Sequence, residues 1–154
     1  MSQTQRADET KELEEFKAKH PNQGMHFKNL KTFPVHYRAL RNTAGAHFEL
    51  SDNKTVECHI SEIAPGSHNK KHRHMNEAII YILTGRGHSI LSDDAGHATR
   101  IDWEEGDIFS PPLNWWHQHF NDDPAKPARY LAFTNIGLMT RLGLFSKESA
   151  KEDE

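Results

Sequence analysis

The stretch Gly66-Ser-His-Asn-Lys-Lys-His72-Arg-His74 carries two histidines one residue apart, and an apolar segment ending at Leu83 follows it. Successive side chains of a β-strand point to opposite faces, so residues i and i+2 share a face. On a strand, His72 and His74 present two imidazoles side by side, as a metal site requires. Taken alone, such a pair also fits two ordinary surface histidines.

A second stretch, GDIFSPPLNWWHQHFN over residues 106–121, supplies two more histidines, His117 and His119. Because a β-barrel brings distant strands together, His117 can complete a metal site that His72 and His74 begin. His119 has the same parity as His117, so it is expected to face the barrel interior as well. It is interpreted either as an acid/base or substrate-anchoring group or as a core histidine hydrogen-bonded to the backbone.

Short segments with strand character, separated by turn signals, occupy the chain from about residue 45. Many short strands at regular spacing predict a sandwich or a small barrel. Residues 8–20 predict a short helix, with acidic residues early and lysines late. We therefore divide the chain into an N-terminal helical or extended arm (1–44), a β-barrel (45–145) and a charged, frayed C-terminal tail (146–154). The strands are expected at 54–63, 72–83, 87–91, 99–103, 107–110, 115–120 and 128–136.

Composition and charge limit the kinds of partner that this chain is expected to bind. The chain has 154 residues, a net charge of −3 and only one cysteine, Cys58. This balance argues against nucleic acid as a partner. The longest apolar run, 78–83, is far shorter than a membrane span, so no membrane partner is expected. The polar start of the chain predicts no secretory signal, and the lone cysteine suits the cytoplasm. A small molecule is the expected partner.

Taken together, the two stretches resemble the two sequence motifs of the cupin superfamily over about residues 54–136. The matching positions are Gly66, His72, His74 and Gly85 in the first motif, and Gly106, Pro112, His117 and Asn121 in the second. The resemblance implies an all-β fold: a cupin barrel (double-stranded β-helix, or jelly roll) preceded by the short N-terminal helical arm.

The sequence departs from the cupin motifs at two positions. Asn114 replaces a glycine, and Asn is the residue best able to keep the positive φ of such a turn. Ala78 stands where the first motif usually has a glutamate ligand. Glu77 is a candidate to replace it as a ligand or supporting residue, although strand parity turns it outward. A bulge near Met75 and Asn76 would turn Glu77 inward.

The alanine at the glutamate position and the segment WHQHFN (116–121) are similar to the gentisate 1,2-dioxygenase group of ring-cleaving cupins. That resemblance implies Fe(II) held by His72, His74 and His117, with His119 in contact with the substrate or supporting the site. Mn, Ni and Zn remain alternative metals.

Further pocket roles follow from parity and motif position. Asn121 is expected to fix a ligand or close a turn. The predicted pocket walls are Trp115, Ile80 and Ile82, and either Cys58 or His59 lines the pocket as well. A basic mouth formed by Lys70, Lys71 and Arg73 would steer an anion.

Three neutral imidazoles leave the charge of a divalent metal uncompensated and leave coordination positions open for a bidentate anion and dioxygen. The sequence therefore predicts a non-haem Fe(II) dioxygenase acting on a small aromatic or enolisable carboxylic acid. The alternatives are a metal-dependent lyase or isomerase of the cupin type and a non-catalytic small-molecule-binding cupin. Exposed strand edges and the arm also predict a homodimer.

Overall fold

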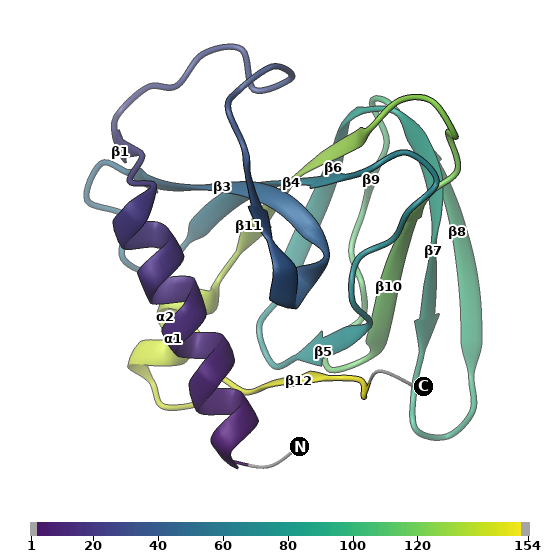
Figure 1. The fold of residues 1–154 in the computed structure, drawn as a ribbon. Helices are drawn as coiled ribbons and strands as arrows, with labels where there is room; N and C mark the ends of the chain where they lie inside the picture. Colours follow the sequence, from purple (N-terminus) through teal and green to yellow (C-terminus); the bar gives the residue numbers. More distant parts are fainter. Residues whose placement is uncertain (1–2, 152–154) are drawn as a thin grey trace.

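Two β-sheets face each other and enclose the interior of a barrel (Figure 1). The computed structural model describes residues 3–151. The larger sheet has the order β1-β3-β4-β11-β6-β9, with β2 added on β3, and the smaller sheet has the order β12-β5-β10-β7-β8. Two facing sheets that form a barrel agree with the all-β fold that the sequence predicts. In the described part of the chain, no helix is long and apolar enough to cross a membrane.

Each expected strand is present, although the one at 72–83 is divided in two, and the strands at 23–24, 36–38, 43–50 and 147–149 were not expected. The helical elements are α1 (Gln3–Lys19), the 3-10 turn η1 (Ala39–Arg41) and α2 (Ile136–Arg141). The larger sheet contains β1 (Gln23–Gly24), β2 (His36–Arg38), β3 (Thr43–Leu50), β4 (Glu57–Ile63), β6 (Ala78–Thr84), β9 (Ile108–Phe109) and β11 (Ala128–Thr134). The smaller sheet contains β5 (His72–His74), β7 (Arg86–Ser92), β8 (Ala98–Glu104), β10 (Trp116–Asn121) and β12 (Lys147–Ser149).

Strand pairing places both histidine stretches in the smaller sheet. β5 and β10 are antiparallel neighbours, with His72 opposite His117, and β10 continues along β7 from Trp116 to Asn121. The single strand expected at 72–83 is divided into β5 and β6 by a bend at Met75 and Asn76. This bend moves the chain from the smaller to the larger sheet, so the two strands contribute to opposite walls of the barrel.

The larger sheet is buried on both faces, for two different reasons. Its inner face carries Ile63, Ile80 and Ile82, which form one core cluster with Trp103 of the smaller sheet and with neighbouring apolar residues. A second cluster around Phe48, Ile60 and Leu131 lies on the outer face, where residues 27–35 cover it. The alternation expected in β4 is therefore inverted relative to a simple barrel: Cys58 and Ile60 face the outer cluster, whereas His59 lines the interior.

The ends of the described chain lie together on one side of the barrel (Figure 1). Residues 146–154 were expected to form a frayed tail. Instead, Lys147–Ser149 forms β12 and pairs with β5 from His72 to His74. Helix α1 packs on its own barrel through Phe16, whose ring contacts His47. Lys147–Ser149 thus completes the edge of the smaller sheet beside two predicted metal ligands, and residues 152–154 lie outside the described part of the chain.

Two backbone positions show why their residue types are needed. Asn114 has a φ of 61°, so asparagine keeps the left-handed turn expected where the cupin motif has glycine. At Gly87, a Cβ would lie 1.9 Å from the carbonyl oxygen of Phe120 and 2.5 Å from the Trp103 ring. Only glycine therefore allows β7 to approach β10 this closely.

Candidate metal centre

Three histidines converge inside the barrel. The ligand nitrogens offered by His72, His74 and His117 all lie within 4.8 Å of one another. β5 contributes the first two, and β10 contributes the third from directly across the pair. His72 and His117 are buried and His74 is half-buried. The site residues predicted from the two separate stretches are thus brought together.

Each of these imidazoles is oriented by a backbone carbonyl. Nδ1 lies 2.9 Å from the Lys70 oxygen in His72, 2.8 Å from the Asn76 oxygen in His74 and 2.9 Å from the Trp115 oxygen in His117. A carbonyl oxygen only accepts hydrogen bonds, so Nδ1 must carry the proton in all three rings. The lone pair of each neutral ring is then on Nε2, which is the atom left to bind a metal.

Burial keeps these rings neutral. Desolvation lowers the pKa of His72 well below its ordinary value, and the nearby Arg41 cation lowers it further. Desolvation, helped by His119 and His74, does the same to the pKa of His117. The pKa of His74 falls to about 4, mainly through desolvation. Neutral imidazoles are the form that binds metals, so the donor set fits a divalent transition metal.

His119 lies beside the three-histidine group and is oriented differently. Its Nδ1 is 2.7 Å from the Ser89 hydroxyl oxygen, which accepts a hydrogen bond from Trp103 Nε1 at 3.0 Å. With Trp103 donating to that oxygen, the hydroxyl proton is free to go to His119 Nδ1, leaving the ring proton on Nε2. Desolvation, with a contribution from Arg41, lowers the pKa of His119 to about 3. His119 is thus a neutral side chain suited to donating a hydrogen bond into the interior.

The histidines line a cavity of about 120 Å³. Of the predicted pocket walls, Ile80 lines it. Ile82 lies deeper and packs in the inner core cluster with Trp103. Trp115 precedes β10 and orients His117 through its carbonyl oxygen. The ring of His59 lines the cavity, whereas Cys58 lies on the opposite face of β4.

Two predicted supporting residues lie elsewhere. Glu77 is exposed, and its carboxylate accepts a hydrogen bond from Asn135 at 2.7 Å, so the bend at Met75 and Asn76 does not bring it to the histidines. Asn121 is buried, and its Nδ2 donates to the carbonyl oxygens of Ile63, Ala64 and Lys126 at 2.8–3.1 Å. Of the two roles expected for Asn121, these contacts correspond to closing a turn.

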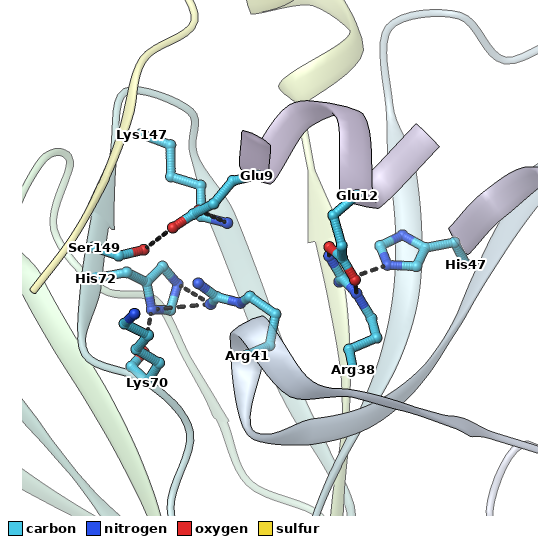
Figure 2. Close-up of polar contacts among 9 residues, drawn as sticks. All are labelled: Glu9, Glu12, Arg38, Arg41, His47, Lys70, His72, Lys147 and Ser149. Atoms are coloured by element: carbon cyan, nitrogen blue, oxygen red, sulfur yellow. Dashed lines mark hydrogen bonds and ion pairs between the residues drawn. The ribbon is translucent and has the colours of Figure 1, made fainter. Parts of the chain in front are cut away.

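The positive charge nearest the centre comes from a residue that sequence analysis missed. Arg41 extends from η1 into the cavity, where its Nη2 lies 2.9 Å from His72 Nε2 (Figure 2). Its Nη1 is buried and makes no hydrogen bond to any residue that the structure describes. The basic mouth was expected elsewhere, but Arg73 forms ion pairs with Asp94 and Glu148. Arg41 lies in the predicted arm, where no motif marks it.

Ion pairs hold helix α1 across this side of the barrel. Glu9 pairs with Lys147 at 2.9 Å, and its other oxygen accepts a hydrogen bond from Ser149 at 2.5 Å (Figure 2). Glu12 pairs with Arg38 at 2.6 Å. Further along the helix, Lys17 pairs with Glu57 at 2.8 Å. The helix and β12 together therefore cover the cavity that contains the histidines.

Comparison with known proteins agrees with this geometry. The cupin domain family matches residues 59–134, and the fold is that of a cupin. The barrel is therefore of the cupin type, with a centre that resembles the three-histidine group of ring-cleaving dioxygenases.

Two relatives are similar in sequence over the barrel. The chain is 30% identical over 95 residues to 1-hydroxy-2-naphthoate 1,2-dioxygenase of Nocardioides sp. (strain KP7), which covers 61% of this chain and 23% of that protein. It is 26% identical over 96 residues to 5-aminosalicylate 1,2-dioxygenase of Comamonas sp., which covers 62% and 24%. The chain thus matches about a quarter of the length of either relative.

Solved structures show the same barrel at lower identity. Salicylate 1,2-dioxygenase of Pseudoaminobacter salicylatoxidans aligns with a TM-score of 0.62 at 13% identity, covering 79% of this chain and 32% of that one. Oxalate decarboxylase of Lactobacillus farciminis aligns with a TM-score of 0.62 at 18% identity, covering 79% and 34%. Equal likeness to two different enzymes means that the fold does not distinguish between their reactions.

Proposed function

We propose that this protein is an Fe(II)-dependent dioxygenase that cleaves the ring of a small aromatic carboxylic acid. The observation that carries this proposal is the convergence of three neutral imidazoles, each with its lone pair on Nε2, at a site where Ala78 replaces the usual glutamate. The sequence relatives, both named as ring dioxygenases, support the same reaction class.

Residues His72, His74 and His117 would hold the metal through Nε2. When bound, an iron ion in such a donor set supplies open coordination positions for a chelating anion and dioxygen, together with redox chemistry. Mn, Ni and Zn also accept imidazole ligands, so the choice of iron is part of the proposal.

Charge in the cavity favours an anionic substrate. Arg41 carries a positive charge beside His72, and no carboxylate lies within ion-pairing distance of it in the described part of the chain. Three neutral histidine ligands add no negative charge to balance a divalent ion. A carboxylate in the cavity would compensate both charges, because opposite charges attract strongly where water is excluded.

The remaining cavity residues would orient the substrate and exclude water. His119 would donate a hydrogen bond from Nε2 to a substrate oxygen, while Ser89 keeps its ring in place. Ile80 and Ala78 offer an apolar wall to a ring. The cavity, at about 120 Å³, suits one small acid. Helix α1, held by its ion pairs, would keep solvent away from the bound molecule.

An oxygen electrode tests the proposal on protein reconstituted anaerobically with Fe(II). The substrates are salicylate, gentisate, 5-aminosalicylate and 1-hydroxy-2-naphthoate, with oxalate as the substrate of the rival lyase reaction. We expect oxygen uptake with at least one aromatic acid, a ring-opened product by mass spectrometry, and no uptake by His117→Ala. Glu77→Gln serves as the matched control, because Glu77 lies away from the centre.

Carbon dioxide released from oxalate without oxygen uptake would instead favour a lyase. Tight binding of an acid to the metal-loaded protein without any turnover would favour a non-catalytic binding cupin. The homodimer and the cytoplasmic location predicted from the sequence stay predictions. Light scattering at micromolar concentration checks the first of them.

A further inference from the structure

Two buried donors without partners lie around the same cavity. Arg41 Nη1 and Asn69 Nδ2 are each shielded from solvent, and neither makes a hydrogen bond within the part of the chain that the structure describes. Both side chains line the cavity that contains the three histidines. An unsatisfied buried donor costs about 1–3 kcal/mol, so each such group needs an explanation.

The orientation of the Asn69 amide is fixed by its partner. The backbone N–H of His119 donates to Asn69 Oδ1 at 2.7 Å, and the backbone N–H of Asn69 donates to the His119 oxygen at 3.1 Å. Because the His119 N–H can only donate, the atom facing it must be the amide oxygen. Nδ2 is therefore the free end, and it belongs to a side chain that is only 1% exposed.

The two donors come from segments that are fastened together. The backbone N–H of Lys70 donates to the Arg41 oxygen at 3.0 Å, and Asn42 Nδ2 donates to the His68 oxygen at 2.7 Å. These bonds hold η1 against the loop before β5, so Arg41 and Asn69 approach the histidines from the same side. His72 follows on the same segment, and Arg41 touches its ring.

The chemistry of Arg41 and Asn69 determines which class of ligand these two donors can bind. A guanidinium and an amide N–H₂ only donate, so their partner must be an acceptor, and the charge of Arg41 favours an anion. A carboxylate offers two oxygens with several lone-pair directions, which is enough for both donors at once. A neutral hydroxyl would leave the charge of Arg41 unbalanced.

We propose that Asn69 Nδ2 and Arg41 Nη1 together form a carboxylate subsite beside the metal centre, in which Asn69 is a substrate-contacting, specificity-determining residue. This inference rests on the proposed function, since it names the protein groups that the carboxylate of that substrate contacts beside the metal. Arg41 supplies the positive charge that attracts the carboxylate, and Asn69 Nδ2 supplies a hydrogen bond that orients it. The subsite therefore favours an aromatic acid over the corresponding alcohol.

Isothermal titration of the Zn(II)-loaded protein tests the subsite without turnover. The probes are salicylate and its uncharged analogue 2-hydroxybenzyl alcohol. The main variant, Asn69→Asp, keeps the oxygen that accepts from His119 but replaces the donor with a second, negatively charged oxygen. We expect this variant to bind salicylate at least tenfold more weakly and the alcohol within threefold of the wild type. Asn53→Asp, with the same change of charge at an exposed position, should bind both as the wild type does.

If Asn69→Asp does not fold, as judged by its thermal transition, Arg41→Gln gives the second measurement. We expect it to lose the preference for salicylate over the alcohol as well. Wild-type protein that binds the two probes equally, or variants that keep the wild-type preference, would overturn the subsite. Salicylate bound tightly by the zinc form, without oxygen uptake by the iron form, would support the subsite and overturn the dioxygenase proposal.

Discussion

His72 and His117 face each other across the β5–β10 pair, and each holds its own ring by the same local contact. In both residues Nδ1 lies 2.9 Å from the carbonyl oxygen of the residue two positions earlier, Lys70 for His72 and Trp115 for His117. The direction of each imidazole is therefore set by the backbone that leads into its strand.

Substitution of the proposed metal ligand His117 and substitution of its neighbour His119 should have different effects on metal binding. We expect His117→Ala to lower the affinity for divalent metal at least a hundredfold, because only two of the three imidazole ligands remain. His119→Gln should change that affinity less than about threefold, because His119 offers no free Nε2 to the group, yet it should lower kcat with the best aromatic acid at least tenfold. Metal titration and oxygen uptake on the same preparations measure both effects. Equal metal loss in the two variants would mean that His119 is a ligand.

Asn121 should matter for stability and not for metal binding. Asn121→Ala removes the donor shared by the carbonyl oxygens of Ile63, Ala64 and Lys126, which leaves buried acceptors unpaired. We expect a loss of about 2–4 kcal/mol in the free energy of unfolding. Urea unfolding measures it, with the exposed Asn53→Ala as a control within about 0.5 kcal/mol of the wild type. A change in metal affinity at unchanged stability would restore the alternative role of fixing a ligand.

Substitution of Gly87, within strand β7, should be far more costly than substitution of a turn glycine. An alanine Cβ there would collide with the Phe120 oxygen and the Trp103 ring, which forces β7 away from β10. We expect a loss of at least about 3 kcal/mol, or roughly 6–12 °C in Tm. Gly96→Ala, at a φ of +90° with open space around it, should lower Tm by only roughly 2–4 °C. Thermal denaturation compares the two variants directly, and similar shifts would contradict this packing.

The metal-free protein should lose stability as the pH falls below about 6.5. Desolvation, with help from Arg38 and Arg41, lowers the pKa of His59 from 6.5 to about 3. Between those values the unfolded chain binds a proton that the folded chain does not, so acid favours unfolding. At pH 5 this single group should account for a loss of about 2 kcal/mol.

His59→Gln isolates that contribution, because glutamine does not titrate. Urea unfolding in the presence of chelator at pH 7.5, 6.0 and 5.0 should show a shallower pH dependence in the variant by up to one proton. A variant with the same slope as the wild type would show that His59 is not buried in its neutral form.

The sequence was sufficient for the architecture and for the histidine group because both follow from spacing. Alternation along short strands predicts a sandwich or a small barrel, the resemblance to the cupin motifs favours the barrel, and matching parity at 72, 74 and 117 predicts rings on one inner face. Asn114 was also predictable, since few residues other than glycine adopt its positive φ. These inferences need only the local chain and the regular geometry of a strand.

The rest of the site could not be predicted because it depends on tertiary contacts. Arg41 reaches the cavity only because η1 is fastened to the loop before β5, and nothing near it in sequence resembles a motif. Lys147 lies in a segment whose charge indicated a solvated tail, yet it pairs with Glu9 over the barrel. The interior of β4 is polar because residues 27–35 bury its apolar face from outside. The alternation of residues along β4 distinguishes its two faces but does not indicate which face points into the barrel.

Helix α1 is fastened to the barrel partly by charge, through the pairs of Glu9 with Lys147, Glu12 with Arg38 and Lys17 with Glu57. Dissolved salt shortens the reach of such attractions, and most strongly where they meet solvent. Leu13 of this helix lines the enclosed space, so weakening these pairs would loosen one wall of the cavity. We therefore expect substrate and product to exchange with bulk solution faster as potassium chloride is added. Ionic strength would then control the rate of turnover without changing the chemical step.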